Sequence, residues 1–166
     1  MQNLAIVGCG RVTQGRYIEV CNEELQNARV VVACDLMTSK ADECARALGC
    51  DPEYDYEAVL QREDVDIVVI LTESGYHYQH ARSALEAGKH VIVEKPPALL
   101  PDHVTHCVKL AAENKRMYAP IVQNRFNPAV RALKESFDQG RFGRQVLSTI
   151  RLRWCRLQDY YMDGWH

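Results

Sequence analysis

Asn3-Leu4-Ala5-Ile6-Val7-Gly8-Cys9-Gly10-Arg11-Val12 is an apolar run that ends in a Gly-x-Gly turn. The run predicts a buried parallel strand, and an amphipathic stretch after it predicts a helix. The two glycines allow a tight turn and leave room for a phosphate, because neither carries a Cβ atom. The helix would point its N–H groups and its positive end at that phosphate. The predicted contacts to a dinucleotide come from Gly8, Cys9, Gly10, Arg11 and Val12.

Thr13 and Asp35 affect the prediction of a dinucleotide site at this turn. Thr13 stands where the full glycine fingerprint has a third small residue, so we expect slightly wider helix–strand packing without loss of phosphate binding. A second apolar run ends at Asp35, 27 residues after Gly8, against about 20 in the usual pattern. A carboxylate there would accept hydrogen bonds from the adenosine ribose and repel a 2′-phosphate. This favours NAD, while Ser39 and Lys40 leave NADP open, and an ordinary strand–helix turn without ligand is the alternative.

Length and composition limit the function classes. With 166 residues the chain can bury one good core, and a second complete domain would not fit. The net charge of −2 gives no reason to expect nucleic acid as a partner. No apolar run approaches the roughly 20 residues of a membrane helix, so no membrane partner is expected. Seven cysteines without a CxxC pair predict free thiols in a reducing cytoplasm and no metal site.

Helices and strands alternate along the first 122 residues. The predicted helices are 11–22, 39–48, 55–61, 77–87 and 101–114. The first would have Tyr17, Ile18 and Cys21 on its inner face. The second would have Ser39 as its N-cap and Gly49 just after its end. The predicted strands after the second run are 66–71, 91–93 and 117–122. This order predicts an α/β fold with a doubly wound parallel sheet. Beyond it we expect a helix over 128–139 and a half-buried, antiparallel-type strand over 146–154.

Glu94-Lys95-Pro96 directly follows the strand predicted over 91–93. Ligands bind at the carboxyl ends of strands in open α/β sheets. There, burial would lower the proton affinity of Lys95, which would then relay a proton from a substrate hydroxyl. Glu94 would position Lys95 or the nicotinamide ribose. The alternative is an ion pair at the strand end.

Together these motifs resemble the Gfo/Idh/MocA oxidoreductases. The resemblance rests on segments that match in type and order, namely Gly8-Cys9-Gly10, Asp35, Thr72 to His77, Ala87 to Val91 and Glu94-Lys95-Pro96. Residues 124–128 and 151–165 resemble members of surface-polysaccharide pathways that act on nucleotide-linked sugars, such as UDP-N-acetylglucosaminuronate 3-dehydrogenases. The resemblance covers essentially the whole chain. It implies a Rossmann-type domain over 1–122, followed at 123–166 by the beginning of a truncated α+β domain.

The resemblance also implies a reaction and a set of residues. Members transfer a hydride between a sugar carbon and NAD(P) while a base handles the hydroxyl proton, and Lys95 matches the family lysine. Thr72, Ser74 and His77 fall in the loop that lines the cofactor, although Glu73-Ser74 replaces the usual Pro-Asn. Further predicted contacts are Glu94 and Gln123 to the cofactor, and Asn124, Arg125, Arg156 and Tyr160 to the sugar substrate.

The chain departs from the family in length. Members are about twice as long, and their second domain carries an Asp…His pair that His166 cannot supply, because it lies too early in the pattern. A dinucleotide-binding module or fragment without turnover is therefore the alternative function. The apolar residues of 146–154 would form an exposed edge, which predicts a homo-oligomer through the C-terminal segment, or a disordered tail.

Overall fold

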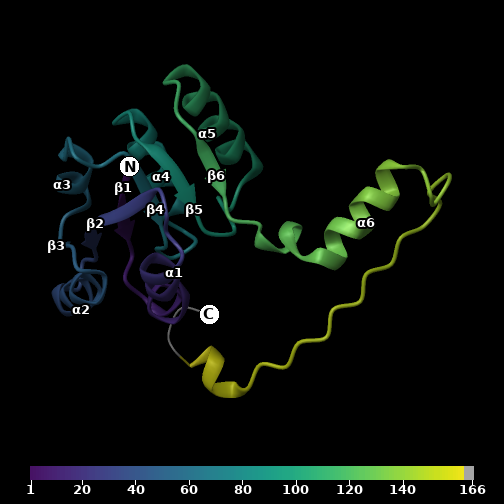
Figure 1. The fold of residues 1–166 in the computed structure, drawn as a ribbon, viewed down its shortest axis with the longest axis horizontal. Coiled ribbons are helices and arrows are strands. Elements are labelled where there is room, and N and C mark those ends of the chain that lie inside the picture. Colours follow the sequence, from purple (N-terminus) through teal and green to yellow (C-terminus); the bar gives the residue numbers. More distant parts are fainter. Residues whose placement is uncertain (163–166) are drawn as a thin grey trace. The chain divides into compact units, whose positions relative to one another are not determined.

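The structure is a computed structural model that describes residues 1–162. The chain forms two compact units, Met1–Ile121 and Val122–His166, and Figure 1 traces the elements of each. The boundary lies one residue before the one predicted at 122. Residues 163–166, which include His166, lie outside the described part of the chain.

A six-stranded parallel sheet organises the first unit. Its strands are β1 (Gln2–Val7), β2 (Ala28–Cys34), β3 (Asp51–Glu53), β4 (Ile67–Ile70), β5 (His90–Val93) and β6 (Tyr118–Pro120). The spatial order is β3-β2-β1-β4-β5-β6. The chain therefore builds outward from β1 in one direction and then, from β4, in the other. Ligands of open α/β sheets bind at such a switch point, here between the carboxyl ends of β1 and β4.

Helices cover both faces of the sheet, which confirms the doubly wound α/β fold. They are the π-helical turn η1 (Thr13–Tyr17), α1 (Ile18–Glu23), α2 (Thr38–Leu48), α3 (Tyr56–Gln61), α4 (His77–Glu86) and α5 (Pro101–Glu113). Val7 and Ile70 pack in one core cluster with residues of α3, α4 and α5. Ile6 and Val69 pack on the opposite face with Tyr17. Successive strand residues point to opposite faces, so both sides of each strand are apolar.

Three details of the first unit differ from the sequence predictions. β3 was not predicted, because Asp51-Pro52-Glu53 has no apolar pattern; it lies at the sheet edge, where proline is tolerated. The N-cap of α2 is Met37 rather than Ser39, because the helix begins at Thr38. The first helix is not regular, since η1 interrupts it before α1.

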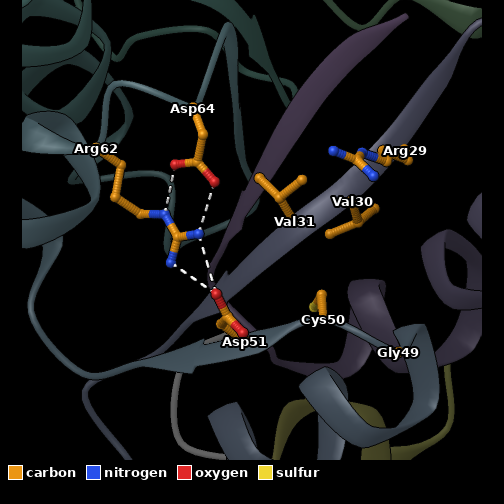
Figure 2. A pocket seen from close by; sticks show the side chains of 8 residues that line it. All are labelled: Arg29, Val30, Val31, Gly49, Cys50, Asp51, Arg62 and Asp64. Atoms are coloured by element: carbon orange, nitrogen blue, oxygen red, sulfur yellow. Dashed lines mark hydrogen bonds and ion pairs between the residues drawn. The ribbon is translucent and has the colours of Figure 1, made fainter.

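A charged cluster lies at the amino ends of the strands, opposite the edge at which a ligand is expected. Arg62 donates two hydrogen bonds to Asp64, at 2.9 and 2.8 Å, and two to Asp51, both at 3.0 Å. Figure 2 shows the guanidinium between the two carboxylates, in a pocket also lined by Val30 and Val31 of β2. The cluster thus ties the start of β3 to the loop before β4, at the amino ends of the strands. Because its arginine is already paired with the protein's own carboxylates, we assign this pocket a structural role.

The second unit contains helices and an extended segment. Its helical elements are η2 (Gln123–Phe126), α6 (Pro128–Asp138) and η3 (Gln158–Tyr161). Asn127 caps α6 by accepting a hydrogen bond from Ala129 N–H at 3.0 Å, and the helix ends near the predicted place. The half-buried strand predicted over 146–154 is wrong: these residues form no strand and are exposed. A strand needs a neighbour for its N–H and C=O groups, and the described part of this unit contains no other strand.

Candidate cofactor and catalytic site

Gly8 is required by the packing of the sheet itself. Its φ is +94°, and a Cβ atom there would lie 2.7 Å from the carbonyl carbon of Leu71 and 2.8 Å from Thr72 N. Only glycine tolerates both the backbone conformation and this approach. Gly8 N–H also donates to Cys34 O at 2.8 Å. The first glycine therefore lets β1 leave the sheet between β2 and β4.

Gly10 differs from Gly8, because no atom of residues 1–162 would lie within 4 Å of a Cβ atom there. Packing within the chain therefore does not explain a glycine at this position. The helix begins directly after it, since Gln14 N–H donates to Gly10 O at 3.0 Å. The positive end of the helix dipole thus lies beside a position without a side chain. This geometry fits the phosphates of a dinucleotide.

Thr13 stands in the place of the third small residue of the glycine fingerprint. It is fully buried, with an exposed fraction of 0%. Its hydroxyl donates to Gly8 O at 2.5 Å, so the side chain satisfies a carbonyl of the glycine turn. Threonine here stabilises the turn internally, a role that the expectation of wider packing did not include.

Asp35 lies at the carboxyl end of β2 and is half-buried. One carboxylate oxygen accepts from Cys9 N–H at 2.8 Å, and the other accepts from Met37 N–H at 2.9 Å. Each oxygen keeps a second lone pair for a further donor. The structure thus brings Asp35 to the glycine turn, where its contact with a ribose stays a prediction.

Glu94 and Lys95 follow β5 at the same edge of the sheet. Glu94 Oε1 accepts from the Tyr17 hydroxyl at 2.9 Å, and Glu94 Oε2 accepts from Lys95 N–H at 2.9 Å. The Lys95–Pro96 peptide is cis. Lys95 is exposed. The expected burial of its side chain is therefore wrong within the described residues. No strand or helix of the first unit covers the side chain, because it follows the last residue of β5 on a loop.

His77 connects the two loops at the ends of β4 and β5. The side chain is buried, and its Nδ1 and Nε2 lie 2.6 Å from Pro96 O and 2.8 Å from Thr72 O. The Thr72 hydroxyl lies 3.0 Å from Nδ1 of His80, and Ser74 is half-buried in the loop between them. His77 was predicted as a cofactor contact. What the structure shows is that it braces the loops.

The remaining predicted contacts belong to the second unit. Gln123, Asn124 and Arg125 are exposed residues of η2, and the Arg156 guanidinium lies over the Trp154 ring, 4.7 Å from its centre. Tyr160 lies in η3. Their roles toward cofactor and substrate stay predictions.

Sequence reasoning missed Tyr17 as a residue of the site. It was expected only on the inner face of the first helix, and its ring does pack there. Its hydroxyl nevertheless reaches Glu94, 77 positions later. No local pattern in the sequence indicates this contact, because it depends on η1.

Comparison with known proteins identifies the family. A family profile described as an oxidoreductase family with an NAD-binding Rossmann fold, Gfo/Idh/MocA, matches residues 2–121. The chain belongs to the Gfo/Idh/MocA family. The match covers the whole first unit except Met1, so the glycine turn, Asp35 and Glu94-Lys95 lie within the matched part.

Several relatives of this family member are named as sugar or inositol dehydrogenases. D-glucoside 3-dehydrogenase of Escherichia coli (strain K12) is 30% identical over 155 residues, which cover 92% of this chain and 44% of that protein. Inositol 2-dehydrogenase of Rhizobium meliloti (strain 1021) is 29% identical and is covered to 44%. The chain thus spans less than half the length of these relatives.

Solved structures agree with the fold. The WlbA dehydrogenase from Bordetella pertussis, in complex with NADH and UDP-GlcNAcA, matches with a TM-score of 0.89 and 31% identity over 96% of this chain and 49% of that chain. A scyllo-inositol dehydrogenase from Lactobacillus casei, with bound NAD(H) and scyllo-inositol, matches with a TM-score of 0.76 and 30% identity, covering 86% of this chain and 42% of that chain. Among the described helices of this Gfo/Idh/MocA member, none is long and apolar enough to cross a membrane.

Proposed function

We propose that this chain is the nucleotide-binding half of an NAD(P)-dependent dehydrogenase that acts on a sugar or nucleotide sugar. One observation carries the proposal: the glycine turn, Asp35 and Glu94-Lys95 meet at the carboxyl edge of a sheet that belongs to this family. The relatives named as sugar and inositol dehydrogenases support the substrate class. The neighbour in complex with UDP-GlcNAcA supports a nucleotide sugar, and through it a place in polysaccharide biosynthesis.

Each group of the chain has a distinct role in the proposed reaction. Nicotinamide, when bound, supplies a carbon that exchanges a hydride with the substrate carbon. Lys95 holds the reacting hydroxyl and takes its proton in the oxidative direction. Glu94 holds the Lys95 segment, and Asp35 accepts hydrogen bonds from the adenosine ribose. From the second unit, Gln123 would contact the cofactor, and Asn124, Arg125, Arg156 and Tyr160 would contact the substrate.

Calorimetric titration of this chain with NADH, and in parallel with NADPH, tests the proposal. We expect micromolar binding of NADH and weaker binding of NADPH, because Asp35 repels a 2′-phosphate. Failure of both nucleotides to bind would overturn the proposal. Stronger binding of NADPH would overturn only the preference for NAD.

A second candidate function is a dinucleotide-binding module without turnover. The observation that favours it is coverage, since the chain spans only 44% of its relatives. Steady-state reduction of NAD with glucosides, inositols and UDP-linked sugars separates the two functions. Turnover with any of them supports the dehydrogenase, whereas tight NADH binding with no turnover supports the module.

We also propose self-association through the C-terminal segment and a cytoplasmic location. Ile150, Leu152 and Trp154 are 71–87% exposed, and apolar side chains in such a row commonly mark a contact surface. All seven cysteines are free, as expected of a reducing compartment. Light scattering that shows a monomer at all concentrations would contradict self-association. A triple substitution of these residues by serine should abolish any concentration dependence of the measured mass.

A further inference from the structure

We propose that Tyr17 is a positioning residue for Glu94-Lys95. Through its hydroxyl it would couple the helix behind the glycine turn to the part of the site that receives the nicotinamide end of the cofactor. This inference rests on the proposed function and deepens it, because it assigns a role to a side chain outside the glycine turn and outside Glu94-Lys95-Pro96. The hydrogen bond from Tyr17 to Glu94, at 2.9 Å, is the contact that carries it.

The π-helical turn places Tyr17. Ile18 N–H donates to Thr13 O, five residues back, so η1 holds one residue more than an α-helical turn. Each residue of an α-helix advances by about 100° around the axis, so one additional residue turns everything after it by roughly that angle. Tyr17 is the last residue of η1. Such single π turns inside helices occur frequently at functional sites.

The ring and the hydroxyl of Tyr17 have different surroundings. The ring packs on a core cluster that includes Leu4, Ile6, Val69 and Leu71, so apolar contacts from β1 and β4 fix its plane. The hydroxyl reaches beyond that cluster to the carboxyl edge of the sheet. Burial, and then the charge and hydrogen bond of Glu94, raise the pKa of Tyr17. The phenol therefore stays protonated at neutral pH and donates to the carboxylate.

Glu94 is held at two points by this arrangement. The Tyr17 hydroxyl occupies one lone pair of Oε1, and Lys95 N–H occupies one of Oε2. Each oxygen keeps a second lone pair with which to accept from a ribose hydroxyl. Without Tyr17, the one remaining hydrogen bond to the carboxylate from the described residues would come from Lys95 N–H, its neighbour in the chain. Tyr17 thus orders the acceptor before the cofactor arrives, which reduces the entropy lost on binding.

The test compares the complete cofactor with a fragment that lacks both nicotinamide and the ribose attached to it. NADH and ADP share the adenosine and both phosphates, so only NADH reports on the nicotinamide end. We expect Tyr17→Phe to weaken NADH binding about tenfold, a typical effect of losing a hydrogen bond to a charged group. ADP binding should change less than about twofold, because ADP lacks the ribose that Glu94 is proposed to hold. The fluorescence of bound NADH should also move toward that of free NADH.

A double-mutant cycle and a control separate positioning from general damage. If Tyr17 acts through Glu94, then Tyr17→Phe/Glu94→Ala should bind NADH no more weakly than Glu94→Ala alone. Tyr54→Phe is the matched control. It removes a tyrosine hydroxyl that donates to another carboxylate, Asp42, at 2.7 Å, and it should leave both affinities unchanged.

Three outcomes would overturn the inference: an equal loss of NADH and ADP binding in Tyr17→Phe, no loss of either, or additive effects in the double variant. In all three cases the proposed function stands, because the wild-type chain binds NADH. If the wild-type chain binds neither ligand, the proposed function itself fails, and the role of Tyr17 fails with it.

Discussion

The carboxylate of Asp35 accepts a hydrogen bond from the backbone N–H of Cys9 at 2.8 Å. The residue that directly follows β2 therefore holds the turn that follows β1. Its second oxygen accepts from Met37 N–H at the start of α2. A single side chain thus fixes two loops at the edge where the nucleotide is proposed to bind.

Substitution of Asp35 should separate its two roles. Asp35→Ala should lower the free energy of unfolding by about 1–2 kcal/mol, because Cys9 N–H loses its half-buried acceptor. Asp35→Asn keeps an acceptor oxygen and should cost less stability, but it removes the charge that repels a 2′-phosphate. The ratio of NADPH to NADH affinity should therefore rise in Asp35→Asn. Urea unfolding and calorimetry measure the two effects. Unchanged NADH affinity in Asp35→Ala would refute the ribose contact.

The two glycines of the turn should respond oppositely to alanine. Gly8→Ala should destabilise the fold by about 3 kcal/mol or more, because its φ is positive and its Cβ would clash with the backbone after β4. The methyl group of Gly10→Ala would meet no atom of the described residues, so the melting temperature of the variant should stay near that of the wild type. Its affinity for NADH should nevertheless fall about tenfold or more, because the new methyl group would occupy the place of a phosphate. A Gly10→Ala variant that binds NADH normally would contradict the phosphate site.

Replacement of Lys95 should affect turnover alone. The side chain is exposed and follows the sheet on a loop, so Lys95→Ala should unfold at the same temperature as the wild type. NADH affinity should change by less than about threefold, because the lysine is assigned to the substrate hydroxyl rather than to the cofactor. Any NAD reduction by the wild-type chain should disappear in the variant. A fully active Lys95→Ala would end the catalytic assignment.

His80 should make the fold sensitive to mild acid. Burial, and then the neighbouring His77, lower the pKa of His80 below its ordinary value of 6.5. Between the lowered pKa and about pH 6.5 the unfolded chain binds a proton that the folded chain does not. The contribution of His80 to stability is therefore complete above about pH 6.5 and falls as the pH drops below it. His80→Gln should flatten the decline measured by urea unfolding between pH 7.5 and 5. Parallel declines in both proteins would contradict this.

One thiol should react much faster than the others. Cys155 is exposed, whereas Cys9 and Cys34 are buried. The hydrogen bond with Cys44 and burial raise the pKa of Cys9, and burial raises the pKa of Cys34 to about 12. Because the thiolate is the reactive form, iodoacetamide at pH 8 should first add a single group, at Cys155. Mass spectrometry of the wild type and of Cys155→Ser checks this. Early labelling of Cys9 would mean that the glycine turn opens readily.

The strands that were predictable from the sequence are the ones whose residues are apolar on both faces. The runs ending at Val7, Cys34 and Ile70 lie in the middle of the sheet, so their composition directly reflects burial. β3 was not predicted because it lies at the edge of the sheet and is largely exposed, so its side chains need not be apolar. The strand expected over 146–154 failed for the opposite reason. Alternation records which face could be buried, but a strand forms only beside a partner.

The candidate site shows the same division. Gly8, Asp35 and Glu94-Lys95 could be predicted, because each follows an apolar run and parallel strands end at one edge of the sheet. The hydrogen bonds among them could not. Whether Asp35 reaches Cys9, or His77 reaches Pro96, depends on the exit angles of loops, and these are set by contacts between segments far apart in the chain.

The wide turn η1 also affects how this chain can be compared with others. Two regular helices can be aligned residue by residue along their whole length. The π-helical turn η1 adds one residue between Thr13 and Tyr17, so the alignment with a regular helix shifts by one position after it. An ungapped alignment can therefore match either the glycine turn or Tyr17 to a regular-helical relative, but not both. A gap of one residue that aligns both segments has to fall inside the helix, where gaps are seldom placed in alignments. When insertions and deletions are compared across this family, the alignment should allow for this shift of one residue.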